Sequence, residues 1–323
     1  MNLKKIVIVS GTVLSIVLLV IVLIRLDWQT FFTTLKTIRF LPVLLAVSAI
    51  MTMICLRSLR WNLIADLPLT QFKYFWQALN IGYLGNFIYP IRAGEVLRIG
   101  AIHRFTSLTL GHAATSAVID RIVDVITLGL FMLVILWLHG RQIDPNIGTS
   151  VVSVFFFATV FLTMLMVYID FLYKKAQGWT VQGKWKQIKI WYLHALEGIQ
   201  AFRQARHLLA ILPLSVLIFF VDFYGMWQIM QAFSWSLPFD AALTTGVFLI
   251  VGVSLPSTPG YIGVYQVACI FALGLYGVDH SSAVAYSIVL QLVNFTVIGL
   301  QGGAVTAYCG FNLSKERQLA TLK

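Results

Sequence analysis

Charged residues are scarce in this chain: only 11% of its 323 residues are charged, and Asp and Glu together number 12. A typical soluble domain carries about 25% charged residues, so this composition argues against a soluble protein. The three cysteines, Cys55, Cys269 and Cys309, lie in apolar segments and form no CxxC or Cys/His pattern. We therefore expect neither a disulfide nor a metal site.

Familiar catalytic motifs are also absent. The chain contains no G-x-S-x-G, no H-E-x-x-H and no Walker loop, and no polar segment long enough for a soluble nucleotide-binding domain. The remaining enzymatic hypothesis is a membrane-embedded lipid transferase that uses Glu95 or Asp120 as a base. Because nothing in the sequence would bind a soluble donor, we expect no enzymatic activity and no cofactor.

Long apolar runs dominate the sequence instead: 59% of the residues are hydrophobic, and the mean hydropathy is +0.87. Residues 6–24 carry no charge and are long enough to cross a hydrocarbon core of about 30 Å as a helix. This run exceeds the apolar region of a cleavable signal peptide, and no A-x-A-like site follows it, so we expect a retained span. The pattern predicts an all-α, polytopic integral membrane protein.

The basic residues indicate the orientation. Of the 23 Lys and Arg residues, 18 fall at the N-terminus or within residues 57–104, 174–206 and 315–323. Only four (Arg25, Lys36, Arg39 and Arg141) fall in segments that we place outside, and Arg121 lies within a span. Segments rich in Lys and Arg stay cytoplasmic, so both termini are predicted to lie on the cytoplasmic side. The membrane is expected to be a bacterial or archaeal plasma membrane. The membrane thus accounts for the net charge of +11, and no nucleic acid is expected as a partner.

Six full spans and two re-entrant hairpins fit this orientation. The hairpins are expected where apolar sequence is broken by Pro and Gly, which relax or interrupt the helical backbone. Two full spans in place of the second hairpin would preserve the orientation equally well. The expected spans are about 6–24, 41–56, 113–138, 147–169, 208–231 and one within 281–314, and the bends use Pro90 and Gly94, then Pro256, Pro259, Gly260 and Gly263.

Residues 171–207 form the largest predicted cytoplasmic loop. Apolar residues from Ile188 to Phe202 recur at spacings of three and four, with cations beside them. This pattern is typical of an amphipathic helix in the headgroup region, and a solvated helix packed on the protein is the alternative.

The two hairpins keep register within one domain, 1–323. Pro90 and Gly94 match Pro256 and Gly260 in a shared P-x-x-x-G at a constant offset, since 256 − 90 = 166 and 260 − 94 = 166. The same offset places the spans of a first unit, about 41–138, over those of a second, about 208–308, with opposite orientation. An inverted repeat of this kind is typical of transporters.

Charged residues inside the apolar segments mark a candidate site, because each costs about 2.5–3.5 kcal/mol near the centre of a span. One hypothesis is that Arg92, Arg98 and Arg121 receive a lipid phosphate while nearby carboxylates hold them in place. The alternative is a set of internal ion pairs that fixes the first hairpin against the 113–138 span. Asp222 and Asn294 either line the same path or bond a neighbouring helix. The acidic members near the hairpin are Glu95, Asp120 and Asp124.

At these positions the chain resembles the lysylphosphatidylglycerol synthase transmembrane family, also called the flippase-like domain or UPF0104 family. Three motifs carry the resemblance, and it covers most of the chain. In the family a Glu commonly follows the third motif, and this chain has Gln266 at that position. The matching residues are Asn86, Pro90, Arg92, Gly94, Glu95 and Arg98, then Asp120, Arg121 and Asp124, then Pro256, Pro259, Gly260 and Gly263.

The resemblance implies the translocation of a lipid between leaflets, without the soluble aminoacyl-transferase domain of multidomain members. The implied cargo is an anionic or aminoacylated phospholipid or a polyprenyl-linked lipid, and a homo-oligomer is possible. A non-transporting accessory role in lipid or glycolipid biosynthesis is the other reading. We place the headgroup's outward path along Ser254, Ser257, Thr258 and Gln266.

Overall fold

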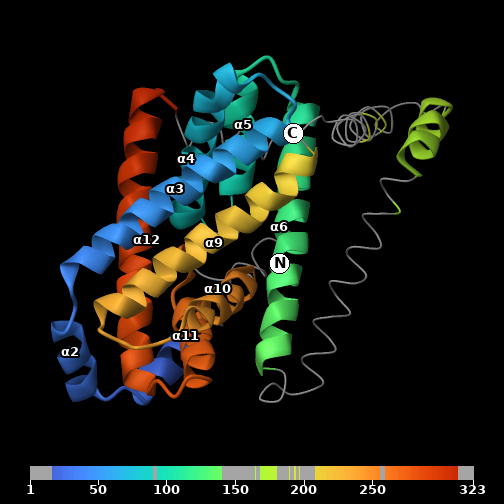
Figure 1. Cartoon of the computed structure of the whole chain (residues 1–323). Helices are drawn as coiled ribbons and strands as arrows, with labels where there is room; N and C mark the ends of the chain where they lie inside the picture. Colours follow the sequence, from blue (N-terminus) through green and yellow to red (C-terminus); the bar gives the residue numbers. More distant parts are fainter. Residues whose placement is uncertain are drawn as a thin grey trace.

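The computed structural model describes residues 17–89, 93–139, 168–179, 208–254 and 259–311, together with positions 164, 189, 193 and 196. These residues are helical or lie in turns and short connections, without a strand among them, which confirms the predicted all-α membrane protein (Figure 1). In chain order, the described helices are α2 (Trp28–Lys36), α3 (Phe40–Ile64), α4 (Phe72–Ile88), α5 (Gly94–Phe105), α6 (Leu110–His139), α9 (Leu208–Ala232), α10 (Phe239–Ser254), α11 (Val264–Gly274) and α12 (His280–Tyr308). Two short 3₁₀ turns, η1 (Leu69–Gln71) and η2 (Pro259–Tyr261), lie before α4 and between α10 and α11.

Within the described residues, four helices, α3, α6, α9 and α12, are long and apolar enough to cross a membrane. A fifth span is formed if the bent pair Val17–Ile24 and Trp28–Lys36, which meet at 89°, is one unit. Most of the predicted span 147–169 and most of the predicted loop 171–207 lie outside the described residues. The expected count of six spans therefore stays a prediction.

The first hairpin is formed by α4 and α5, which pack closely because small residues face one another. A Cβ at Gly82 would lie 2.9 Å from Cβ of Arg98, so glycine permits this approach. The Asn86 Oδ1 accepts a hydrogen bond of 2.9 Å from the Gly94 backbone N–H and closes the bend. Pro90 and Arg92 lie outside the described residues.

The second hairpin is formed by α10 and α11, which are 16 and 11 residues long. Both are shorter than the roughly 20 residues that a full span needs, which favours a hairpin over two spans. Between them, Gly260, Tyr261 and Gly263 have φ values of 75°, 61° and 86°. Left-handed backbone turns the chain sharply, and glycine adopts it without a steric penalty. Pro256 lies outside the described residues.

Helices α3 and α9 cross through the middle of the bundle as an antiparallel pair. The Arg39 N–H donates to the Ala232 carbonyl at one end (2.8 Å), and the Arg60 Nη1 donates to Ser215 Oγ near the other (3.1 Å). Helices α6 and α12 stand on either side of this pair, and the two hairpins lie toward opposite ends of the bundle (Figure 1). This arrangement brings the tips of the two hairpins together near its centre.

We expect the opposite ends of the bundle to differ in access to a membrane-impermeant thiol reagent. Cysteines at Lys73, exposed at the start of α4, and at Lys184 should be shielded in intact cells, because the Lys/Arg distribution places both inside. Cysteines at Asp144 and at the exposed Thr33 of α2 should react. Labelling is scored with and without membrane permeabilisation, and labelling at Lys184 from outside would contradict this orientation.

Candidate functional site

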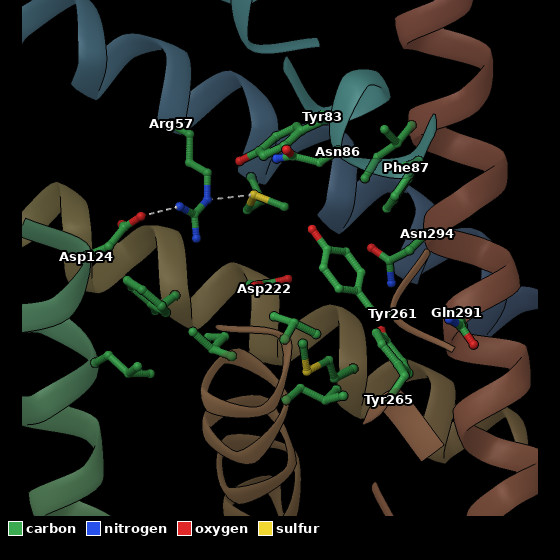
Figure 2. A pocket seen from close by; sticks show the side chains of 18 of the residues that line it. Arg57, Tyr83, Asn86, Phe87, Asp124, Asp222, Tyr261, Tyr265, Gln291 and Asn294 are labelled. Carbon is green, nitrogen blue, oxygen red and sulfur yellow. Dashed lines mark hydrogen bonds and ion pairs between the residues drawn. The ribbon is translucent and has the colours of Figure 1, made fainter. Parts of the chain in front are cut away.

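A cavity of about 470 Å³ lies between the long helices and the tips of both hairpins. Helices α4 and α12 supply Asn86, Phe87 and Asn294 to its wall, and the second hairpin supplies Tyr261 and Tyr265 (Figure 2). Phe87 and Phe295 pack with ring centroids 4.5 Å apart. The cavity therefore lies where the tips of the two helical hairpins meet, among helices with the length and composition of membrane spans.

One wall of the cavity is charged. Arg57 Nη1 lies 2.9 Å from Asp124 Oδ2, and its Nε donates to Met53 Sδ at 3.0 Å (Figure 2). Arg121 Nη1 lies 3.1 Å from the same Asp124 oxygen, and its Nε lies 3.8 Å from Glu95 Oε2. A guanidinium has five N–H donors, so Arg57 and Arg121 retain the capacity to bind an anion in the cavity.

Behind this wall lies a second, fully buried set of ion pairs. Arg60 Nη2 lies 2.7 Å from Asp120 Oδ1 and 2.7 Å from Asp124 Oδ1. Arg98 Nη1 lies 3.1 Å from Asp120 Oδ2, and the Arg98 guanidinium stacks over the Trp61 ring at 4.8 Å. The side chains of Arg60, Arg98 and Asp120 are 2% exposed or less, and none of the three lines the cavity. Asp124 belongs to both sets, and two more ion pairs connect them: Arg98 Nε lies 2.7 Å from Glu95 Oε2, and Arg121 Nη2 lies 3.3 Å from Asp120 Oδ2.

The geometry thus divides the predicted charged site into two parts. Glu95, Arg121 and Asp124 line the cavity, as the binding hypothesis requires. Arg98 and Asp120 are held in buried ion pairs, as the alternative hypothesis proposed for the cluster.

Sequence reasoning missed Arg57 and Arg60, which it counted as markers of the cytoplasmic side. The predicted span ended near residue 56, whereas α3 continues to Ile64, because the Arg–Asp pairs offset the cost of these cations inside the bundle. The signal was present in the spacing. Arg57 and Arg60 are three apart on α3, and Asp120 and Asp124 are four apart on α6, so each pair shares one helix face.

Of the other three residues predicted to meet the lipid, Asp222 and Asn294 line the cavity and Gln266 does not. Asp222 lines the cavity, and no hydrogen bond or ion pair of its carboxylate is found within the described part of the chain. Asn294 also lines the cavity and donates from Nδ2 to the Leu290 carbonyl at 2.9 Å. Gln266 is 4% exposed and is not among the cavity-lining residues. Among the described residues, no group of three or more His, Cys, Asp or Glu side chains could hold a metal ion.

The tip of the second hairpin carries local backbone strain beside the cavity. Tyr261 adopts the left-handed region, which costs a non-glycine residue about 1–2 kcal/mol. Strain of this kind persists only where the surrounding structure imposes it, and it concentrates at functional sites. The ring of this strained residue faces the cavity (Figure 2).

Replacing Gly260 by Ala should lower the melting temperature more than the same change at Gly277. Both glycines have φ of 75°, but a Cβ at Gly260 would lie 2.7 Å from Phe295 Cζ, whereas Gly277 has no neighbouring atom within 4 Å. The shared backbone penalty cancels in the comparison, so the difference measures the contact with Phe295. Thermal unfolding of the two purified variants in detergent tests this, and equal losses would show that the tip does not pack on α12 as described.

The chain is similar to a known family of membrane proteins. Residues 7–302 match the model of the family described as the lysylphosphatidylglycerol synthase TM region. A UPF0104 membrane protein of the archaeon Methanocaldococcus jannaschii is 22% identical over 235 residues, which is 72% of this chain and 96% of that protein. No solved structure matches the chain. The match to the family model extends over both hairpins and the charged cluster, and the chain therefore belongs to the lysylphosphatidylglycerol synthase transmembrane-region family.

Proposed function

We propose that the protein moves a lipid with a charged headgroup between the two leaflets of the membrane. The observation that carries this proposal is the cavity itself, because it holds two guanidinium groups and three carboxylates inside a bundle of apolar helices. Ionisable groups at this depth are costly, so they mark a path for a polar or charged cargo.

The apolar part of the cavity wall suits the acyl chains. Helices α6 and α10 contribute Val125, Leu128, Leu249 and Val253 to the lining, and the Val125 side chain is 40% exposed. We propose that the cavity opens to the bilayer beside Val125 of α6. A headgroup can enter from this side while its acyl chains remain in the bilayer.

The predicted inverted repeat offers a mechanism of alternating access. Adding 166 to the bounds of α3 (40–64) gives 206–230, against 208–232 for α9. Adding 166 to those of α4 (72–88) gives 238–254, against 239–254 for α10. Each unit runs as a long helix, a hairpin and a long helix, and the two units would open the cavity in turn to either leaflet.

The charges of the cavity favour particular cargo. Arg57 and Arg121 suit the phosphate of an anionic, aminoacylated or polyprenyl-linked lipid, because arginine binds phosphate with two parallel hydrogen bonds. Glu95 and Asp222 suit a cationic group on the same headgroup. The charged wall lies toward the end with the first hairpin, predicted to be cytoplasmic, so we propose uptake on that side and outward release.

Reconstitution into liposomes with a panel of fluorescent lipids tests this function. We expect the protein to accelerate transfer of phosphate-bearing lipids between leaflets, measured as the fraction that an impermeant quencher reaches, and to leave a neutral diacylglycerol analogue at the rate of empty liposomes. Mass spectrometry of the extracted lipids should show no chemical change. A modified lipid would instead support the membrane-embedded transferase, and acceleration of no lipid would favour an accessory protein.

A further inference from the structure

Two buried glutamines join α12 to the tip of the second hairpin. The Gly263 backbone N–H donates to Gln266 Oε1 at 2.8 Å, and Gln266 Nε2 donates to Gln291 Oε1 at 2.8 Å. Gln291 Nε2 then donates to the Gly260 carbonyl at 2.6 Å. The side chains form a closed relay that starts and ends on the backbone of the tip.

The relay has one direction. It begins at a backbone donor and ends at a backbone acceptor, so turning either amide around would place oxygen against oxygen or N–H against N–H. Gln266 must therefore accept with one atom and donate with the other. A protonated carboxylic acid can do the same, whereas an ionised carboxylate can only accept.

The relay encloses the strained residue of the cavity wall. Gly260 and Gly263, which it holds from both sides, flank Tyr261, and all three have positive φ. Tyr261 lines the cavity together with Gln291, whereas Gln266 lies behind them at 4% exposure. Loss of the relay would free the tip to relax and withdraw the Tyr261 ring from its place.

We infer that Gln266 and Gln291 are positioning residues, which fix Tyr261 in the cavity through a directional amide relay. This inference rests on the proposed function of the cavity. It assigns Gln266 a role different from the one expected from sequence, where Gln266 met the headgroup on its way out. A relay affects every cargo alike, whereas a contact with the headgroup depends on headgroup charge.

The substitution Gln266→Glu makes the relay depend on pH. At about pH 5 the introduced carboxyl, buried in an apolar hairpin, is mostly neutral and can still donate to Gln291, whereas at about pH 8 ionisation removes the donor. We expect transfer near the wild-type rate at the lower pH and a loss of about fivefold relative to wild type at the higher pH, for anionic and zwitterionic lipids equally. Gln266→Met, which cannot donate at any pH, should be impaired to the same extent at both.

A second readout needs no lipid transfer. The melting temperature of Gln266→Glu in detergent, subtracted from that of the wild type at the same pH, should give a difference that grows from about pH 5 to about pH 8. Gln29→Glu is the matched control, because Gln29 is exposed on α2, and its difference should stay constant. If the wild type moves no lipid while this pH-dependent difference persists, the proposed function fails and the relay stands.

Three results would overturn the inference. A pH-independent melting difference for Gln266→Glu would show that the side chain only fills space. A pH-dependent melting difference with unchanged transfer, measured well below the melting temperature, would show a purely structural relay. Impairment confined to anionic lipids would return Gln266 to direct contact with the headgroup.

Discussion

Asp120→Ala is expected to unfold or severely destabilise the protein, and it is the most damaging single substitution that the structure indicates. Asp120 is the shared partner of Arg60 and Arg98, whose side chains are 0% and 2% exposed. Without this carboxylate, Arg60 keeps only its pair with Asp124 (2.7 Å), and Arg98 keeps only its pair with Glu95 (2.7 Å), whose side chain is 32% exposed. The four arginines of the cluster then share two carboxylates, and breaking a buried pair costs about 3–5 kcal/mol. We expect loss of most monodisperse protein on purification and a large fall in melting temperature.

Two further variants separate lost charge from lost volume. Arg121→Ala removes a cation of the same cluster whose side chain is 38% exposed, so its effect on stability should be small. The triple variant Arg60→Met, Asp120→Leu and Arg98→Met replaces the buried pairs with apolar side chains of similar size and should recover much of the stability. If Asp120→Ala has the same yield and melting temperature as the wild type, these ion pairs do not hold the bundle together.

Arg57→Gln is expected to reduce lipid transfer more than tenfold while leaving the protein folded. Arg57 lines the cavity, and a charge-assisted hydrogen bond to a phosphate contributes about 1.5–3 kcal/mol, which corresponds to roughly 10- to 150-fold in rate or affinity. Its partner Asp124 keeps Arg60 and Arg121 at 2.7 Å and 3.1 Å, so no buried carboxylate is left unpaired. The substitution therefore affects cargo binding more than folding.

The same separation applies to the residues expected from sequence. Ala at Arg92, Glu95 or Arg121 should abolish transfer with insertion and yield largely intact. Lys73→Gln is the control, because it removes an exposed cation that does not line the cavity. Transfer by the liposome assay and melting temperature are measured on the same preparations. Parallel losses of stability and transfer in Arg57→Gln would assign Arg57 to the structural ion pairs.

The helical hairpins were predictable because backbone chemistry is local. Gly94, Gly260 and Gly263 indicate bends in an otherwise apolar sequence. In the structure, α5 begins at Gly94, and the other two glycines lie between α10 and α11. The helix boundaries were less predictable than the helices themselves. The length of an apolar run indicates that a span exists, but it does not show whether the helix continues past charged residues. Residues 57–64 of α3 are the clearest case.

The division of the charged cluster could not be predicted. Sequence spacing put Arg98, Asp120, Arg121 and Asp124 in one group, yet which of them face a cavity depends on how α3 packs against α6 and α9. The partners that decide it, Arg57 and Arg60, lie more than 50 residues from Asp120 and Asp124 along the chain. The role of Gln266 in the relay likewise depends on Gln291, 25 residues away on another helix.

We expect a lipid headgroup to occupy the cavity between the two hairpin tips. Photo-crosslinking with a phospholipid that carries a photoreactive group on its headgroup, followed by peptide mass spectrometry, detects this occupancy. Adducts should form on cavity-lining residues such as Tyr83, Tyr261 and Tyr265, and excess unlabelled lipid and Arg57→Gln should both reduce them. Adducts confined to the outer surface, at residues such as Trp137 and Leu300, with no effect of Arg57→Gln, would contradict it.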